Sequence, residues 1–375
     1  MPSSQVQYQK FSSRLYEKSV ETLVPIRGQF ALTYRCGLRC QMCYTDCYNS
    51  LPFVRKELPT EKILSLLEEI QEAGCLWLCF TGGDPLIHPD FEKIYLKAKE
   101  KGFLLTLFTN GISMTQEKVD FLSTYRPFVI EITQYGATQK TYETVTQIPG
   151  SFERFQAGIE RILHHKLPLK LKAIVIRQNA HEFEAIKAFA HSVGASFRST
   201  AMINPRLNRD LAPVAMRLSP EEILDLFYPE GSTDKTILPP PTPYRIRCGT
   251  GLNSFFIDPY GKLLFCATLE EPNYDLTKGS FQEGVRTLYP RMRTQMYRPD
   301  SLCRDCEIYA LCDKCPAHID GEGDPEQPVE FYCKIAHGRA KRLGIDVKRP
   351  VFWKDGKPTL HESILSPASV RSDPG

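Results

Sequence analysis

The chain has 375 residues, of which 42% are hydrophobic and 24% are charged, and its formal net charge is +3. This composition is ordinary for a globular protein of about two domains, and so small a charge does not indicate nucleic acid as a partner. We find neither a signal-peptide pattern nor an apolar run of membrane-spanning length, so the sequence predicts a cytoplasmic protein without membrane attachment.

Apolar runs and amphipathic segments alternate from residue 29 onward. The expected strands are Gln29–Tyr34, Leu76–Thr81, Phe103–Phe108, Phe128–Thr133, Leu169–Ile176 and Ser196–Met202. The expected helices are the one containing Ile63, Leu66, Leu67 and Ile70, then Phe91–Lys101, Phe152–His164, His181–Val193, and a last one with Ser219 as its N-cap and Glu222 as its capping-box acid. Strands and helices in this order predict an α/β fold with a parallel sheet. The pattern alone leaves open whether the sheet is flat or closes into a barrel.

Three cysteines follow the first predicted strand. Cys36, Cys40 and Cys43 have the spacing C-x3-C-x2-C. Three thiolates this close together can hold three irons of a four-iron cluster and leave the fourth iron open to a small molecule, whereas zinc sites more often use paired C-x2-C arms. Taken alone, this spacing also fits a structural metal site or a chance grouping of cysteines.

A glycine-rich turn follows the second predicted strand. Its sequence is Thr81-Gly82-Gly83-Asp84-Pro85, which on its own is typical of an ordinary turn. The turn and the cysteines each come directly after a strand, in a fixed order, so together they are far more specific than either motif alone.

This ordered pair of motifs resembles the signature of the radical S-adenosylmethionine (SAM) enzymes, with Asp84 in place of the glutamate of the family's GGEP motif. The resemblance implies a partial (β/α)6 barrel of the TIM type. It also implies a SAM-binding [4Fe–4S] cluster, whose reduction cleaves SAM to a 5′-deoxyadenosyl radical that takes hydrogen from the substrate. The ligands of that cluster would be Cys36, Cys40 and Cys43.

The same resemblance implies which residues contact SAM. Gly82 and Gly83 would let backbone approach its methionine moiety, and Asp84 would accept hydrogen bonds from its ammonium. Further candidates lie close to the third cysteine or at carboxyl ends of strands: Met42, Tyr44, Thr109, Asn110, Glu131, Thr133, Lys172 and Arg198. Glu131 and Lys172 lie within apolar strands, so an internal ion pair is the alternative interpretation for each.

A run of prolines over residues 238–243 predicts a linker between two domains. We therefore expect an N-terminal segment over 1–27, a barrel over 28–237, the linker over 238–243, a cysteine-rich domain over 244–336 and a tail over 337–375.

The cysteine-rich segment holds seven cysteines between Cys248 and Cys333. With so little room for a core, these thiols predict bound metal, and their spacing fits paired zinc sites about as well as iron–sulfur clusters. The array resembles the SPASM extension of radical SAM enzymes. Two residues separate Cys312 from Cys315, where three are usual in that extension.

The SPASM resemblance implies two auxiliary [4Fe–4S] clusters. The ligands would be Cys248, Cys266 and Cys315 for the first cluster, and Cys303, Cys306, Cys312 and Cys333 for the second. Some SPASM enzymes have one more cysteine shortly before the first. Here residues 241–247 contain none, so we expect a fourth ligand other than cysteine in the first auxiliary cluster.

The family resemblance also implies the reaction class. SPASM enzymes mostly modify precursor peptides made on the ribosome, by crosslinking, epimerisation or excision, and this chain is similar to the pyrroloquinoline quinone and mycofactocin maturases. Only 35 residues precede Cys36, too few for a leader-binding module. We therefore expect a separate recognition protein, together with an electron donor such as flavodoxin or ferredoxin.

Two alternatives remain open. One is a radical SAM enzyme that acts on a sulfatase, forming formylglycine, or on a small metabolite. The other is a zinc-stabilised binding module without enzymatic activity, which would be colourless because zinc has a filled d shell.

Overall fold

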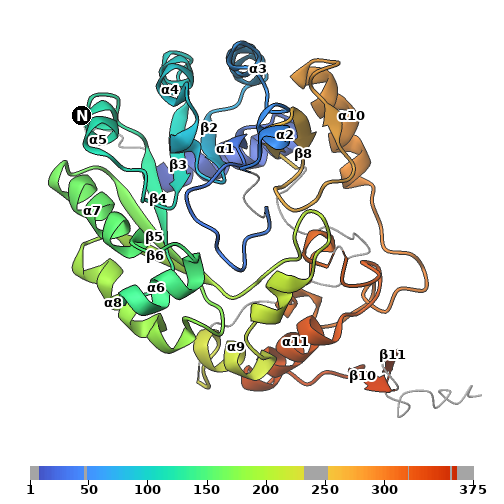
Figure 1. Ribbon diagram of the computed structural model, residues 1–375. Coiled ribbons are helices and arrows are strands. Elements are labelled where there is room, and N and C mark those ends of the chain that lie inside the picture. The colour runs from blue at the N-terminus through green and yellow to red at the C-terminus, as the bar shows by residue number, and fades with distance from the viewer. Residues whose placement is uncertain (1–7, 46–48, 232–251, 320, 355–356, 361–375) are drawn as a thin grey trace, which may run out of the picture. The chain divides into compact units, whose positions relative to one another are not determined.

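The structure is a computed structural model that describes residues 8–45, 49–231, 252–319, 321–354 and 357–360. The chain divides into two compact units (Figure 1). The first unit comprises Met1–Arg217, Ile246–Gln295 and Asp320–Glu322, and the second comprises Leu218–Arg245, Met296–Ile319 and Gly323–Gly375.

Among the described residues, nine strands of the first unit form one sheet in the order β6-β5-β4-β3-β2-β1-β7-β8-β9. The first six strands of the chain are β1 (Arg27–Thr33), β2 (Trp77–Gly82), β3 (Leu104–Thr109), β4 (Val129–Gln134), β5 (Leu169–Ile174) and β6 (Ser196–Thr200). Each is parallel to its neighbours. All six predicted strands are confirmed, with ends that differ by no more than two residues, and they form a partial TIM-type barrel.

Helices connect these strands and lie along the outer side of the sheet (Figure 1). The helices of this part of the chain are α1 (Tyr8–Thr22), α2 (Leu51–Val54), α3 (Thr60–Glu72), α4 (Phe91–Glu100), α5 (Gln116–Thr124), α6 (Gln139–Thr146), α7 (Ser151–His164) and α8 (Phe183–Ser192). The four helices predicted between strands are α3, α4, α7 and α8. The other four are short or polar segments that the periodicity did not indicate.

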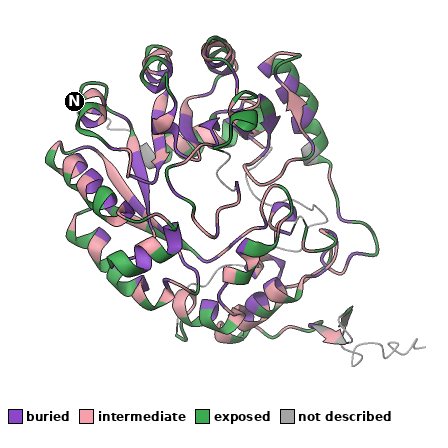
Figure 2. Ribbon diagram, viewed as in Figure 1, coloured by how far each residue is buried: buried purple, intermediate pink, exposed green. Residues whose placement is uncertain are grey.

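The two faces of the parallel sheet differ in chemistry. Leucine, isoleucine and phenylalanine side chains of the strands pack against the helices in the main core, among them Phe30, Phe80 and Ile132. Figure 2 shows the corresponding burial, with exposed residues mainly on the outer sides of the helices. Because side chains alternate along a strand, the residues next to these point to the inner face. Glu131 and Thr133, on either side of Ile132, are therefore on the inner face.

Three further strands extend the sheet beyond β1. β7 (Ser254–Ile257) pairs with β1 in parallel, and β8 (Lys262–Leu264) and β9 (Tyr274–Asp275) follow in antiparallel order. α10 (Phe281–Arg293) comes next, and the Phe281 N–H donates to Glu69 of α3 at 2.7 Å. Part of the segment expected in the cysteine-rich domain thus belongs to the sheet. The predicted linker at 238–243 lies outside the described residues and stays a prediction.

The second unit contains α9 (Pro220–Phe227), α11 (Glu330–Arg342) and the hairpin of β10 (Val351–Lys354) and β11 (Lys357–Leu360). The predicted capping box of α9 is confirmed, because Ser219 Oγ accepts the Glu222 N–H at 3.1 Å and Glu222 accepts the Ser219 N–H at 2.7 Å. In the described part of the chain, no helix is both long and apolar enough to cross a membrane.

Gly28 marks the point where β1 and β7 come closest. A Cβ atom on Gly28 would lie 2.0 Å from the ring of Phe255. That ring is buried and packs edge-on against Phe281, with ring centroids 4.7 Å apart. The absence of a side chain at Gly28 therefore makes room for the aromatic residue that joins β7 to the core.

We expect Gly28→Ala to lower the free energy of unfolding by about 1–3 kcal/mol through overpacking. In a Phe255→Ala background the same change should cost under about 1 kcal/mol, because the ring is absent. A double-mutant cycle measured by urea unfolding tests this. Equal costs in the two backgrounds would show that Gly28 and Phe255 are not in contact.

Candidate active site

The three cysteines after β1 lie close enough for their charges to interact. Burial raises the pKa of the Cys40 thiol well above its ordinary value, and the neighbouring Cys43 and Cys36 raise it further. The Cys43 N–H donates to the Cys40 carbonyl at 3.0 Å, and the Cys43 sulfur lies 3.2 Å from the Thr45 hydroxyl. The spacing in the sequence thus corresponds to a real cluster of thiols in space.

Polar side chains hold the start of this loop. Arg35 donates through its backbone N–H and its Nε to the Thr33 hydroxyl, both at 3.0 Å, and through Nη2 to Glu57 at 3.1 Å. Thr33 in turn donates to Glu57. On the other side of the loop, the Asn49 side chain exchanges two hydrogen bonds of 3.0 Å with the backbone of Cys36.

The glycine pair after β2 packs directly against the start of the cysteine loop. The Gly83 N–H donates to the Thr33 carbonyl and the Asp84 N–H to the Arg35 carbonyl, both at 2.9 Å. A Cβ on Gly83 would lie 2.2 Å from the Arg35 oxygen, and one on Gly82, whose φ is +134°, would lie 2.0 Å from the Thr33 oxygen. The close approach that requires these glycines is therefore to the chain's own backbone. Their contact with SAM stays a prediction.

Asp84 is completely buried beneath this junction. Its Oδ1 accepts from the Leu86 N–H at 3.1 Å and from the Thr109 hydroxyl at 3.0 Å. Its Oδ2 is buried and has no hydrogen-bond partner among the described residues. Burial raises the pKa of Asp84 from 3.8 to about 6. A buried carboxyl oxygen without a hydrogen-bond partner fits a role in accepting from the ammonium of a ligand.

The end of β3 joins the same junction. Thr109 binds Asp84, as described, and the Asn110 side-chain amide donates to the Cys36 sulfur at 3.3 Å. The Leu38 N–H also donates to that sulfur, at 3.4 Å. N–H donors directed at sulfur are typical of cysteines that ligate iron–sulfur clusters. The structure thus brings together predicted residues that follow β1, β2 and β3.

Met42 and Tyr44 lie on two sides of the cysteine loop. Met42 is buried in an apolar cluster that includes Val145, Ile176 and the edge of Cys40. Burial raises the pKa of Tyr44, and Cys43 and Cys266 raise it further, which places its hydroxyl near both thiols. Their proposed role in holding adenine is untested.

Glu131 forms a buried ion-pair network on the inner face of the sheet. Arg198 donates to both of its carboxylate oxygens, one at 3.0 Å, and the Lys172 and Lys170 ammonium groups lie 3.4 and 3.6 Å away. Burial acts to raise the pKa of Glu131, but Arg198 and the lysines outweigh it and lower the pKa. The alternative interpretation of an internal ion pair is thus confirmed for Glu131 and Lys172.

The cations of this network also contact an aromatic ring. Lys172 Nζ lies 4.4 Å from the centroid of the Phe108 ring, and the Arg198 guanidinium lies 5.7 Å from it. Lys170, Lys172 and Arg198 are all partly exposed, whereas Glu131 is buried. Three cations against one carboxylate give the inner face an excess of positive charge. Thr133 is buried beside Lys172 in the strand register.

Four cysteines of the second unit surround one mostly apolar cavity. Cys303, Cys306, Cys312 and Cys333 line it together with Ile308, Tyr309, Lys314 and Ala336. Burial raises the pKa of Cys333, and the other three thiols raise it further, so all four are neighbours. In the part of the chain that the structure describes, no three metal-binding side chains converge closely enough to hold a single ion. The four thiols line one cavity, and their role as ligands of a cluster stays a prediction.

The remaining cysteines are placed less completely. Cys266 follows β8 in the first unit, with its sulfur 3.7 Å from the Thr268 hydroxyl. Cys315 precedes the short helix Pro316–His318 of the second unit, and its carbonyl accepts the His318 N–H at 2.9 Å. Cys248 lies outside the described residues. The first auxiliary cluster is therefore untested.

Some residues that support the cysteine loop were not predicted. The Tyr135 and Cys40 side chains pack against the same apolar cluster, and Asn49, Thr45 and Glu57 hold the loop as described. Tyr135 directly follows β4, so its place at a strand end was the one available signal. Asn49 and Glu57 lie in irregular segments with no such pattern.

Comparison with known proteins supports the interpretation of the cysteine loop and the glycine-rich turn as radical SAM motifs. Residues 30–190 match the sequence model of the Radical SAM superfamily, and this range contains the end of β1, the three cysteines, the glycine-rich turn and β2 to β5. Residues 30–190 therefore form a radical SAM domain, and the protein is an enzyme. A domain of this kind implies one [4Fe–4S] cluster and SAM, which together supply a carbon-centred radical. The three neighbouring thiols, the N–H donors at Cys36 and the buried oxygen of Asp84 fit these groups.

Three relatives show how far the similarity extends. The AdoMet-dependent heme synthase of Methanosarcina barkeri is 28% identical over 340 residues, which cover 82% of this chain and 96% of that protein. The PqqA peptide cyclase of Ruegeria pomeroyi is 29% identical over 171 residues, covering 46% and 45%. The solved structure of anSMEcpe with bound AdoMet and Cp18Cys peptide superposes with a TM-score of 0.61 at 15% identity, covering 84% of this chain and 96% of that one. The last similarity concerns the fold alone.

The buried carboxyl of Asp84 makes stability depend on pH. Because its pKa is raised to about 6, the folded protein retains a proton that the unfolded chain releases, so stability falls as pH rises from about 4 to about 6. We expect Asp84→Asn to remove up to about 3 kcal/mol of this pH dependence in SAM-free protein. Thermal unfolding at pH 3.5 and pH 7 measures it, with the exposed Glu92→Gln as control. An unchanged pH dependence in Asp84→Asn would contradict the prediction.

Proposed function

We propose that this enzyme cleaves SAM reductively at a cluster held by Cys36, Cys40 and Cys43 and abstracts a hydrogen atom from a residue of a ribosomally made precursor peptide. The observation that carries the first part is the junction of the three strand ends. There, Asn110 donates to the Cys36 sulfur and the backbone of Gly83 and Asp84 is bonded to the residues just before Cys36.

Each side chain has a role in that step. Asn110 and the Leu38 N–H stabilise negative charge on the Cys36 sulfur. Asp84 accepts from the SAM ammonium through its unpaired Oδ2. Thr109 fixes the carboxyl group of Asp84 in position. Met42, Tyr44, Gly82, Gly83 and Thr133 are further proposed contacts of SAM.

The peptide substrate is supported by sequence similarity to PqqA peptide cyclase over about half of the chain. We propose that a separate protein presents the leader peptide and that flavodoxin or ferredoxin supplies the electron. We also propose two auxiliary [4Fe–4S] clusters. Cys248, Cys266 and Cys315 would hold the first with a fourth ligand that is not cysteine, and Cys303, Cys306, Cys312 and Cys333 would hold the second.

Anaerobic assays for 5′-deoxyadenosine test the radical chemistry. Reconstituted protein with SAM and dithionite should form it, whereas the Cys36/Cys40/Cys43→Ala variant should lose at least about 99% of the rate, because the SAM-binding iron site is absent. The variant should keep its auxiliary iron, measured by iron and sulfide analysis. A colourless parent protein with stoichiometric zinc and no product would instead support the binding-module alternative.

A second candidate substrate is a heme precursor. The heme synthase of M. barkeri matches this chain over 96% of its own length, far more than the peptide cyclase does. Heme precursors carry carboxylate side chains, and the cationic inner face of Lys170, Lys172 and Arg198 suits carboxylates. This observation favours a carboxylated porphyrin over an uncharged metabolite.

Parallel turnover assays separate the two substrates. The enzyme is given either the product of a short neighbouring gene, with its partner protein, or an iron porphyrin with propionate side chains, and mass spectrometry follows each substrate. If the porphyrin reacts, Arg198→Gln should raise KM about tenfold, which corresponds to about 1.4 kcal/mol. Modification of the peptide alone, with no change in the porphyrin, would eliminate the second candidate.

A further inference from the structure

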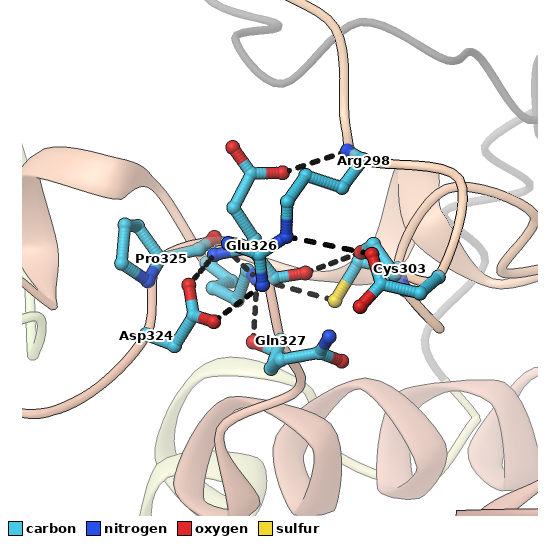
Figure 3. Close-up of polar contacts among 9 residues, drawn as sticks. Arg298, Cys303, Asp324, Pro325, Glu326 and Gln327 are labelled. Atoms are coloured by element: carbon cyan, nitrogen blue, oxygen red, sulfur yellow. Dashed lines mark hydrogen bonds and ion pairs between the residues drawn. The ribbon is translucent and has the colours of Figure 1, made fainter.

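A buried lysine contacts the thiol cavity of the second unit. Lys314 is 5% exposed. Its ammonium donates to the Cys303 sulfur at 3.1 Å, to the Pro325 carbonyl at 3.0 Å and to the Gln327 carbonyl at 2.7 Å. Figure 3 shows how residues 324–327 and Cys303 surround these contacts. An ammonium has three N–H donors, so all of them are used and the group is fixed in place.

No carboxylate of the described residues lies within ion-pair distance of this ammonium, although Asp324 is close enough for the charge of Lys314 to lower its pKa. Two of the three groups that accept from the ammonium are neutral carbonyls. The Tyr297 ring, 5.3 Å away, adds only a weak cation–π contact. A buried charge is costly unless an opposite charge pairs with it. Of the three acceptors, only the Cys303 sulfur can carry a negative charge, as it does when it binds metal.

A second N–H of the same residue points to another sulfur of the cavity. The backbone N–H of Lys314 donates to the Cys312 sulfur at 3.4 Å. Lys314 thus contacts two of the four thiols that line the cavity, one through its backbone and one through its side chain. Hydrogen bonds to sulfur and nearby net charge are two of the main factors that set the potential of an iron–sulfur cluster.

We propose that Lys314 is a positioning residue that raises the reduction potential of the cluster held by Cys303, Cys306, Cys312 and Cys333. Reduction adds one electron and breaks no bond, so the cluster and its thiolates become more negative by one charge. The fixed ammonium stabilises that state more than the oxidised one. The inference rests on the proposed second auxiliary cluster. It predicts that this cluster accepts an electron more readily than it would without Lys314.

Glu326 carries the opposite charge in the same place. It is buried, and its carbonyl accepts from the hydroxyl of Ser301, which itself accepts the Cys303 N–H at 3.2 Å. Glu326 also accepts the backbone N–H of Arg298 at 3.0 Å. Glu326 and Lys314 therefore form a pair of opposite charges near one thiol, and neutralising each should move the potential in opposite directions.

The test is an EPR-monitored redox titration with dithionite of the reconstituted protein. The Cys36/Cys40/Cys43→Ala background removes the signal of the SAM-binding cluster. We expect Lys314→Met to make one-electron reduction at least tenfold less favourable, a fall of about 59 mV. Lys314→Arg should retain most of the potential, and Glu326→Gln should raise it. The exposed Arg298→Gln, which loses its ion pair with Asp324, is the matched control and should leave the potential unchanged.

Iron and sulfide analysis of each variant distinguishes the possible failures. Absence of iron at these four cysteines in the parent protein overturns the proposed cluster and this inference with it. A Lys314→Met protein with its full iron content and an unchanged potential overturns the inference but not the proposed cluster. Lys314 would then only hold the backbone of residues 325–327 in place. If Lys314→Met loses its iron, the reduction potentials of Lys314→Gln and Glu326→Gln are compared instead. Shifts of these two variants in the same direction overturn the inference, and shifts in opposite directions support it.

Discussion

The parallel pairing of β1, β2 and β3 is the constraint on which the site depends. Because parallel strands end at the same edge of a sheet, the loops that follow them meet there. The glycine pair lets two backbone N–H groups reach the carbonyls of Thr33 and Arg35. Cys36 directly follows Arg35 in the chain, so backbone hydrogen bonds between the ends of neighbouring strands fix the position of Cys36.

The inner face of the sheet differs from that of a filled barrel. Closed TIM barrels pack apolar side chains in the interior, whereas here Glu131 is surrounded by Arg198 and two lysines. These charges are tolerable because they pair with one another and are partly exposed to water. The inner face of this sheet is therefore charged where the interior of a closed barrel is apolar.

Much of this arrangement could be predicted from local sequence. The strands and their order follow from apolar periodicity, and the site residues Cys36, Asp84 and Asn110 each come directly after a strand. The pairing of β1 with β7 could not be predicted in this way, because it joins segments far apart in the chain and leaves no periodic signal. Nor could the contacts of Tyr135, Glu57 and Lys314, which depend on where side chains point in three dimensions.

The pairing of β1 with both β2 and β7 also has a consequence for how the protein is made. β2 (Trp77–Gly82) leaves the ribosome soon after β1, but β7 (Ser254–Ile257) emerges only after most of the barrel. Until then, one edge of β1 lacks its native neighbour, and open strand edges are prone to pair with other chains. The cysteine loop at the end of β1 is therefore attached to a strand that gains its second neighbour late in synthesis, so the proposed cluster would be inserted most stably after that event.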